Sequence, residues 1–277
     1  MSLVLTGRDG TVPPVATPDP FAPLLANPGR SGILTDFDGS LSPIVADPMS
    51  ARPVPGAPEA MAHLATVFGR VAVISGRPLS FLRRVLGSVG VVLVGQYGME
   101  RLVDGEVELD PAVEPWVGAA VQAATELERA LPGLYVERKG EISCVVHWRT
   151  SPAREEEALA LARDIAERHG LAAQPGRMSI EVRPPVAINK GTSVEGLAGG
   201  LDAVLFAGDD RGDLDAFRAL DRMVADGRIT HGVKLAVQSE EIPAELLQEA
   251  DERVAGPEEL VRVFDHLARA ATEQRRG

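Results

Sequence analysis

The stretch Ile33-Leu34-Thr35-Asp36-Phe37-Asp38-Gly39-Ser40-Leu41 decides the fold of this chain. An apolar run ends in two aspartates that are one residue apart, and the glycine after them allows a sharp turn, which is typical of a strand that delivers carboxylates to a site. Two carboxylates so close repel each other, and a hard divalent cation such as Mg²⁺ relieves this while binding phosphate. Phosphoryl transfer is the leading hypothesis, although a surface turn or a Ca²⁺ loop would also explain this stretch alone.

Two further apolar runs end in polar residues in the same way. Val71–Ile74 leads to Ser75-Gly76-Arg77, and Ala203–Ala207 leads to Gly208-Asp209-Asp210-Arg211-Gly212-Asp213. Short aliphatic runs with helical segments between them predict an α/β fold with a parallel sheet covered by helices on both faces. Ligands bind beyond the carboxyl ends of such strands, so we expect these polar residues to lie at one rim.

The remaining segments predict a core, an insertion and a lead-in. Helices are expected at 57–67, 78–86 and 257–271, and a buried strand at 91–94. Residues 109–184 contain no motif of this kind and predict long helices at 113–131 and 152–169 with strands at 135–137, 143–148 and 179–182. We therefore expect a core of residues 31–108 and 185–271, and an inserted α/β cap of residues 109–184, joined to the core through 105–111 and 183–189. Residues 1–30 contain many prolines and predict a mobile lead-in that ends in a short helix near residues 21–25.

In this order, the motifs resemble those of the haloacid dehalogenase-like phosphatase superfamily. The resemblance implies a Rossmann-like core with a cap of type C2B, and it implies that Asp36 is the nucleophile and Asp38 the general acid and base. Ser75 would bind a phosphoryl oxygen, and Lys190 in Asn189-Lys190-Gly191 would stabilise the transition state. Magnesium would be bound by Asp36, Asp38, Asp209 and Asp213, with Asp210 close to it.

A narrower resemblance, to the trehalose-6-phosphate phosphatases, extends from about residue 33 to residue 255. It rests on stretches outside the generic motifs: Gly95-Gln96-Tyr97-Gly98-Met99-Glu100, Glu137-Arg138-Lys139-Gly140, His147-Trp148-Arg149 and Ile180-Glu181-Val182-Arg183-Pro184. The resemblance implies that Glu137, Lys139 and Glu181 of the cap bind the hydroxyls of the sugar distal to the phosphate. It also implies that Arg77 and Asn189 take part in substrate binding.

The chain departs from the pattern of that family near the expected substrate. Ser40 stands where Thr is usual, Tyr97 where His is usual, and Gly212 and Leu214 where Thr and Glu are usual. Dephosphorylation of trehalose 6-phosphate is the function expected, and another phosphorylated disaccharide, pseudo-disaccharide or sugar is the alternative. A phosphosugar mutase and a sugar-phosphate sensor without turnover are the more distant alternatives.

Composition excludes other classes of function. The net charge of −12 and the aromatic content of 4% argue against nucleic-acid binding, which needs a basic surface and stacking side chains. No apolar span is long enough for a membrane helix, and the first residues do not predict a signal peptide. The single cysteine, Cys144, predicts a buried thiol rather than a disulfide. We expect a cytoplasmic enzyme, a monomer by default, with a phosphosugar as its only partner.

Overall fold

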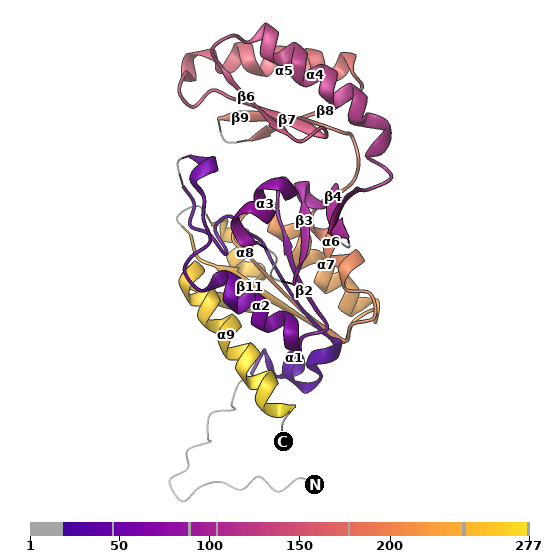
Figure 1. Cartoon of the computed structure of the whole chain (residues 1–277), viewed down its shortest axis with the longest axis vertical. Coiled ribbons are helices and arrows are strands. Elements are labelled where there is room, and N and C mark those ends of the chain that lie inside the picture. Colours follow the sequence, from indigo (N-terminus) through magenta and orange to yellow (C-terminus); the bar gives the residue numbers. More distant parts are fainter. Residues whose placement is uncertain are drawn as a thin grey trace, which may run out of the picture.

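The strand before Asp36 lies inside an eight-stranded sheet, the core sheet, in the computed structural model of the chain (Figure 1). The structure describes residues 19–45, 47–87, 90–103, 105–176, 178–239 and 242–275, so most of the predicted lead-in lies outside the described residues. The strand order is β12-β11-β10-β1-β2-β3-β4-β5, parallel from β12 to β3 and antiparallel from β3 to β5. The bounds are β1 Ser31–Thr35, β2 Arg70–Ile74, β3 Val92–Gly95, β4 Glu100–Val103, β5 Glu106–Leu109, β10 Ala203–Gly208, β11 His231–Val237 and β12 Glu252–Val254.

Helices cover both faces of the core sheet because its central strands are apolar on both sides. Ile33 and Leu205 pack with one group of helices, and Leu34 and Phe206 pack with the other. The first group is α1 Ala22–Ala26, α2 Ala57–Val67, α3 Leu79–Leu86 and α9 Pro257–Gln274, and the second is α6 Lys190–Leu197, α7 Asp213–Ala225 and α8 Ala244–Glu249. The predicted helices at 57–67, 78–86 and 257–271 are confirmed to within three residues, as is the short helix near 21–25.

A separate four-stranded antiparallel sheet, the cap sheet, lies above the core sheet in Figure 1. Its order is β6-β7-β9-β8, with β6 Tyr135–Lys139, β7 Ser143–His147, β9 Ser179–Arg183 and β8 Ala172–Gly176. The helices α4 Val117–Ala130 and α5 Glu155–Arg168 pack on one face of it, around Trp148, Val146 and Ile180. The other face is turned toward the core sheet (Figure 1), and the predicted fold class is thereby confirmed.

Three local features differ from what the sequence suggests. The run that begins at Ile33 suggests a strand that continues to Phe37, but β1 ends at Thr35 because the chain already turns at Asp36 toward the bridge between Asp38 and Ser42. Residues 106–109, expected to belong to a connection, form β5 and extend the core sheet. Residues 172–176 form β8 although they contain Pro175, which an edge strand tolerates because one side of it needs no hydrogen bonds.

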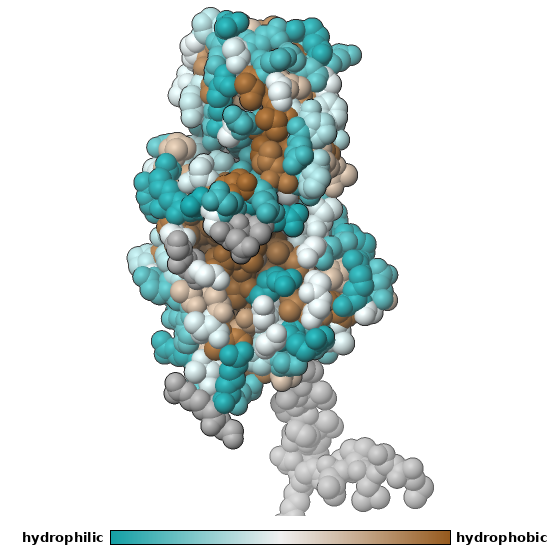
Figure 2. Space-filling model, turned by 45° about the vertical axis from the view of Figure 1, so that its right-hand side comes forward, coloured by the Kyte–Doolittle hydropathy of each residue, from teal (hydrophilic) through white to brown (hydrophobic). Residues whose placement is uncertain are grey.

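The surface agrees with the acidic composition. Hydrophilic side chains cover most of the face shown in Figure 2, and hydrophobic ones gather in a band along its middle. Among the described residues, no helix is long and apolar enough to span a membrane.

Candidate active site

Asp36 is placed by the end of β1 and by the turn that follows. Its amide donates to the carbonyl of Ala207 at 2.9 Å, which aligns it with the end of β10. Gly39 has a φ of +79°, and a Cβ built on it would lie 2.0 Å from a carboxylate oxygen of Asp209. Only glycine therefore fits where this turn passes over Asp209. The turn brings Asp36 and Asp209 together although they lie far apart in the sequence.

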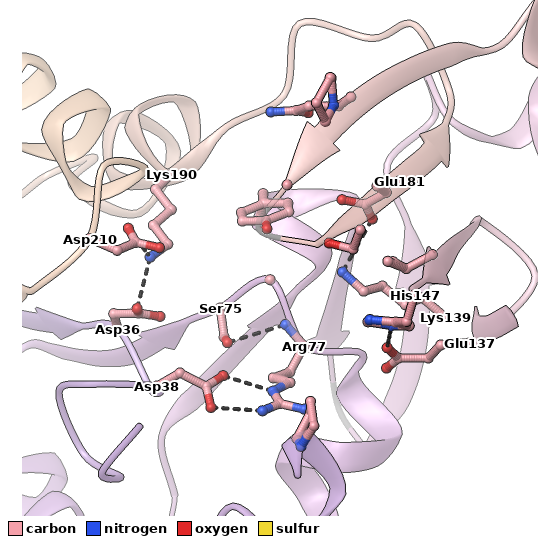
Figure 3. A pocket seen from close by; sticks show the side chains of 18 residues that line it. Asp36, Asp38, Ser75, Arg77, Glu137, Lys139, His147, Glu181, Lys190 and Asp210 are labelled. Carbon is pink, nitrogen blue, oxygen red and sulfur yellow. Dashed lines mark hydrogen bonds and ion pairs between the residues drawn. The ribbon is translucent and has the colours of Figure 1, made fainter. Parts of the chain in front are cut away.

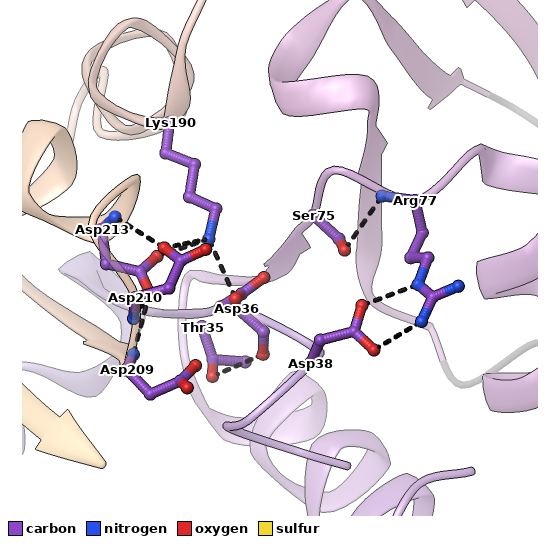
Figure 4. Close-up of polar contacts among 9 residues, drawn as sticks. All are labelled: Thr35, Asp36, Asp38, Ser75, Arg77, Lys190, Asp209, Asp210 and Asp213. Atoms are coloured by element: carbon purple, nitrogen blue, oxygen red, sulfur yellow. Dashed lines mark hydrogen bonds and ion pairs between the residues drawn. The ribbon is translucent and has the colours of Figure 1, made fainter. Parts of the chain in front are cut away.

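Lys190 binds three carboxylates at the bottom of the site (Figure 4). Its Nζ lies 2.9 Å from Asp36 Oδ2, 2.6 Å from Asp213 Oδ1 and 3.4 Å from Asp210 Oδ1. Burial alone would lower the pKa of Lys190, but the three aspartates outweigh it and raise this pKa well above its usual value. The ammonium group is therefore charged beside Asp36 before any substrate arrives.

Asp213 fixes the loop after β10. Its Oδ2 accepts the amides of Asp209 at 2.8 Å and Asp210 at 2.9 Å, and its Oδ1 accepts from Lys190. Both oxygens thus have partners already, and burial raises the pKa of Asp213 to about 7. These contacts favour a positioning role for Asp213, and its assignment as a metal ligand stays a prediction.

The acidic cluster fits a hard divalent cation. Carboxylate oxygens of Asp36, Asp210 and Asp213 lie within 4.8 Å of one another. Asp209 Oδ1 is buried, and among the described residues it has no hydrogen-bond partner. Burial, followed by the charges of Asp213 and Asp210, raises the pKa of Asp209 to about 8. Burial likewise raises the pKa of Asp36 well above its usual value, with Lys190 opposing it. Negative charge is therefore in excess here, and an oxygen-binding cation would stabilise it.

Asp38 lies on the other side of Asp36 and is bound by Arg77 (Figures 3 and 4). The guanidinium group contacts both carboxylate oxygens, from Nε at 2.7 Å and from Nη2 at 2.8 Å. The amide of Arg77 donates to Ser75 Oγ at 3.2 Å. Ser75 and Arg77 follow β2, as expected, and face the carboxylates that follow β1.

The cap sheet supplies a polar wall opposite these residues (Figure 3). Alternate residues of each strand share a face, and the register aligns Glu137 with Val145 and Glu181, and Lys139 with Ser143. Lys139 Nζ and Ser143 Oγ contact Glu181 Oε1 at 3.2 and 2.9 Å. His147 Nε2 lies 2.9 Å from Glu137 Oε2, and this hydrogen bond lowers the pKa of Glu137.

One cavity of about 320 Å³ joins the two sides. It is lined by eight of the residues predicted from the sequence: Asp36, Asp38, Ser75, Arg77, Glu137, Lys139, Glu181 and Lys190. Asp209 and Asp213 lie buried beneath it. Asn189 lines a second cavity of about 420 Å³ instead, and its side chain caps α6 by accepting the amide of Thr192 at 3.0 Å. Its role in substrate binding stays a prediction.

Three residues that line the first cavity were not expected in the site from the sequence: His147, Gln174 and Ser179. Tyr97 and Asp210, which were expected near the substrate and the metal, line it as well. His147 could have been found, because it lies two residues after Val145 on a strand whose neighbour carries Glu137. Gln174 could not, because β8 itself was not expected.

Comparisons with known proteins show the family to which this chain is similar. Residues 34–249 match the family model described as trehalose-phosphatase. The trehalose-phosphate phosphatase of Mycobacterium leprae is 36% identical over 207 residues, which cover 69% of this chain and 48% of the relative. That of Mycobacterium tuberculosis is 34% identical over 221 residues, covering 76% and 54%. The chain thus spans about half the length of the curated relatives it matches.

Solved structures share the fold. A trehalose-6-phosphate phosphatase related protein superposes with a TM-score of 0.72 at 20% identity, over 88% of this chain and 99% of the other. The C-terminal domain of the Candida albicans trehalose-6-phosphate phosphatase gives 0.65 at 24%, over 89% and 96%. A haloacid dehalogenase-like hydrolase from Bacteroides thetaiotaomicron gives 0.61 at 13%, over 86% and 99%. At these identities the likeness concerns the fold alone, and it is the haloacid dehalogenase-like fold that the motifs predict.

Proposed function

The chain belongs to the trehalose-phosphatase family, and on that premise we propose that it is a Mg²⁺-dependent phosphomonoesterase that converts trehalose 6-phosphate into trehalose and phosphate. One observation carries the proposal. A single cavity joins paired carboxylates and a buried lysine on the core side to a wall of charged side chains on the cap side. The first set suits a phosphate and the second suits the hydroxyls of a sugar.

The proposed reaction has two steps. A carboxylate oxygen of Asp36 attacks phosphorus, the bond to the sugar oxygen breaks, and Asp38 gives that oxygen a proton. Asp38 then takes a proton from water, the water oxygen attacks phosphorus, the bond between phosphorus and the Asp36 oxygen breaks, and phosphate leaves while the carboxylate of Asp36 is restored. Lys190 and Ser75 would stabilise the charge of the phosphoryl oxygens during both steps.

The contacts of Asp38 add a condition to this scheme. Both of its oxygens accept hydrogen bonds from Arg77. Proton transfer to a leaving group needs one of these oxygens to face the substrate. Release of one of the two bonds by Arg77 would free an oxygen of Asp38 for this role, and a phosphosugar oxygen would be the new acceptor for the guanidinium group.

Magnesium would be held by Asp36, by Asp209 and by the backbone carbonyl of Asp38. When bound, it would neutralise the phosphate and keep Asp36 ionised. This proposal uses the excess of negative charge described above, including the unpartnered Oδ1 of Asp209.

The test measures phosphate release from a panel of phosphorylated mono- and disaccharides and from an aryl phosphate. Replacing Glu137, Lys139 or Glu181 by alanine should lower kcat/KM for trehalose 6-phosphate by roughly 10- to 100-fold, about 1.4 to 2.7 kcal/mol. The aryl phosphate reaches only the core carboxylates, so its slow hydrolysis should change little.

Arg138→Ala is the matched control. Arg138 lies on β6 between Glu137 and Lys139, but it contacts Glu128 and Thr125 of α4. This variant should keep the activity on trehalose 6-phosphate. Equal losses on both substrates would show that the cap residues only support the fold.

A second candidate, a phosphatase for another phosphosugar, is favoured by the departures at Tyr97, Gly212 and Leu214. Tyr97 lines both cavities, and Gly212 and Leu214 line the second. A clear preference in the panel for a different phosphosugar would establish this alternative and leave the proposed chemistry unchanged.

A further inference from the structure

Tyr97 lies where three parts of the active site meet. Its amide donates to the carbonyl of Ser75 at 2.8 Å, and the amide of Gln96 donates to the carbonyl of Arg77 at 3.0 Å. On the other side, Ser193 of α6 donates its hydroxyl to the carbonyl of Tyr97 at 3.0 Å. The backbone of Tyr97 is thus fastened both to the loop after β2 and to the helix that begins with Lys190.

These bonds impose an unusual backbone conformation. Gln96 and Tyr97 have φ values of +47° and +64°, in the left-handed region that residues with a side chain rarely adopt. Such a conformation costs on the order of 1 to 3 kcal/mol at each residue and persists where the surroundings demand it. It fixes where the ring of Tyr97 points.

The ring contacts both the phosphate side and the sugar side of the site. A Cβ built on Gly76 would lie 2.6 Å from both Cζ and Oη of Tyr97, so the phenol end lies directly against the loop that carries Ser75. Lys139 Nζ lies 5.8 Å and Arg183 Cζ 5.4 Å from the centre of the ring. Lys139 lines the first cavity, Arg183 the second, and the ring of Tyr97 borders both.

The hydroxyl of Tyr97 is available to a ligand. Among the described residues no group is recorded as forming a hydrogen bond with it, although the side chain is half-buried. A tyrosine in such a position usually finds a partner for its hydroxyl. Since this hydroxyl lies beside Gly76, the part of a bound phosphosugar that it can reach is the sugar next to the phosphate.

We propose that Tyr97 is a specificity-determining residue, whose hydroxyl binds the sugar ring that carries the phosphate and whose ring closes the first cavity toward the second. The inference rests on the proposed function, because it assumes a phosphosugar substrate. It divides recognition between two groups of residues. Glu137, Lys139 and Glu181 bind the distal sugar, and Tyr97 binds the proximal one.

The experiment compares wild type with Tyr97→Phe, which removes the hydroxyl and keeps the ring. The readout is the ratio of kcat/KM for the preferred phosphosugar of the panel to kcat/KM for the aryl phosphate. We expect Tyr97→Phe to lower this ratio roughly tenfold, as the loss of one hydrogen bond would. The ratio is independent of how much of the preparation is folded, because a misfolded fraction lowers both rates equally.

Tyr135→Phe is the matched control. Tyr135 is the only other tyrosine of the chain, it is 59% exposed, and it does not line the first cavity. This variant should leave the ratio unchanged. A ratio unchanged in Tyr97→Phe would overturn the inference while the proposed function stands. Wild type without activity on any phosphosugar would overturn both.

Discussion

Lys190 organises the site at the scale of single residues. Its ammonium group binds Asp36, and it does so because Asp210 and Asp213 bind it from the other side. A charge that is fixed before the substrate arrives needs no reorganisation during the reaction, which is the main source of electrostatic catalysis. This arrangement also places several carboxylates close together, and a single lysine does not neutralise their combined charge.

The two aspartates after β1 should respond differently to loss of charge. Asp36→Asn should remove nearly all phosphatase activity, because an amide cannot form the aspartyl-phosphate. Asp38→Asn should slow both proton transfers and let phosphorylated protein accumulate, which phosphate labelling or intact mass would detect. Asp221→Asn, at an exposed aspartate paired with Lys234, is the control and should behave like wild type. Turnover above a few per cent of wild type in Asp36→Asn would contradict the assignment of Asp36 as the nucleophile.

Cys144 predicts a pH dependence of stability. Burial raises the pKa of its thiol to about 12, whereas an unfolded thiol has a pKa near 8.5. A pKa that is higher in the folded state contributes stability below the unfolded value and loses it as the pH rises. Between pH 7.5 and 9.5 the free energy of unfolding of wild type should fall by about 1.4 kcal/mol more than that of Cys144→Ala.

Urea titrations of both proteins at the two pH values measure this difference. Alkylation gives a second readout, since the native thiol should resist iodoacetamide at pH 8 and react after unfolding. Parallel pH dependence of the two proteins would show that the thiol ionises in the folded state.

At the scale of elements, the turns between strands and helices place the chemistry. The turn after β1 crosses Asp209, and the turn after β3 carries Tyr97 against Gly76. Gly39 after β1 and Gly76 after β2 must be glycines, because the side chains of Asp209 and Tyr97 occupy the space that a Cβ would take. The geometry of the candidate site therefore requires residues without a Cβ at these two positions.

Gly39→Ala tests this dependence. The new methyl group would meet the carboxylate of Asp209 at 2.0 Å and the residue would be strained at a φ of +79°. We expect a loss of about 2 to 4 kcal/mol in stability and at least a 100-fold loss in kcat. Gly87→Ala is the control, since Gly87 has a φ of +70° with nothing within 4 Å. It should lose about 1 to 3 kcal/mol of stability, because its backbone conformation favours glycine, and it should keep its kcat. Equal kcat in both variants would contradict the close approach.

The sequence predicts elements where the pattern is local. The helix at 57–67 was found because Met61, Leu64 and Val67 recur on one face, and all three are buried. β8 was missed because Pro175 and Gly176 argue against a strand unless the partner strand is known. Asp36, Asp38 and Ser75 were found as candidates because they follow apolar runs, and Lys190 because it opens a helix. The partners of Asp38 and Glu137 were not, because their hydrogen bonds join residues 39 and 10 positions apart.

At the scale of the whole molecule, the site exists only where the cap sheet faces the rim of the core sheet. Ser143 of the cap donates to Gln96 of the core at 3.0 Å, and Arg183 donates to the carbonyl of Ile188 at 3.1 Å. An apolar contact joins the two parts as well, because Ile142 of the cap is buried together with Met99 of the core, so polar and apolar side chains both hold the cap sheet over the rim.

Removal of divalent ions should affect activity and stability together. Chelation should abolish phosphate release, and Mg²⁺ should restore it. Because a bound cation would offset the repulsion of the buried carboxylates, Mg²⁺ should also raise the Tm of the whole chain. Asp209→Asn should lose this rise, and Asp221→Asn should keep it. Full activity after exhaustive chelation would exclude a metal requirement.

The position of β1 between β2 and β10 has a consequence for biosynthesis. Ser31 pairs with Ala203, so β1, which carries Asp36 at its end, can pair with β10 only after β10 has been synthesised. At 5 to 20 residues per second, this interval lasts roughly 10 to 30 s. During that time one edge of the apolar strand β1 has no partner strand, and such an edge can pair with another chain. The central position of the strand that carries Asp36 thus delays completion of the core sheet until β10 has been synthesised.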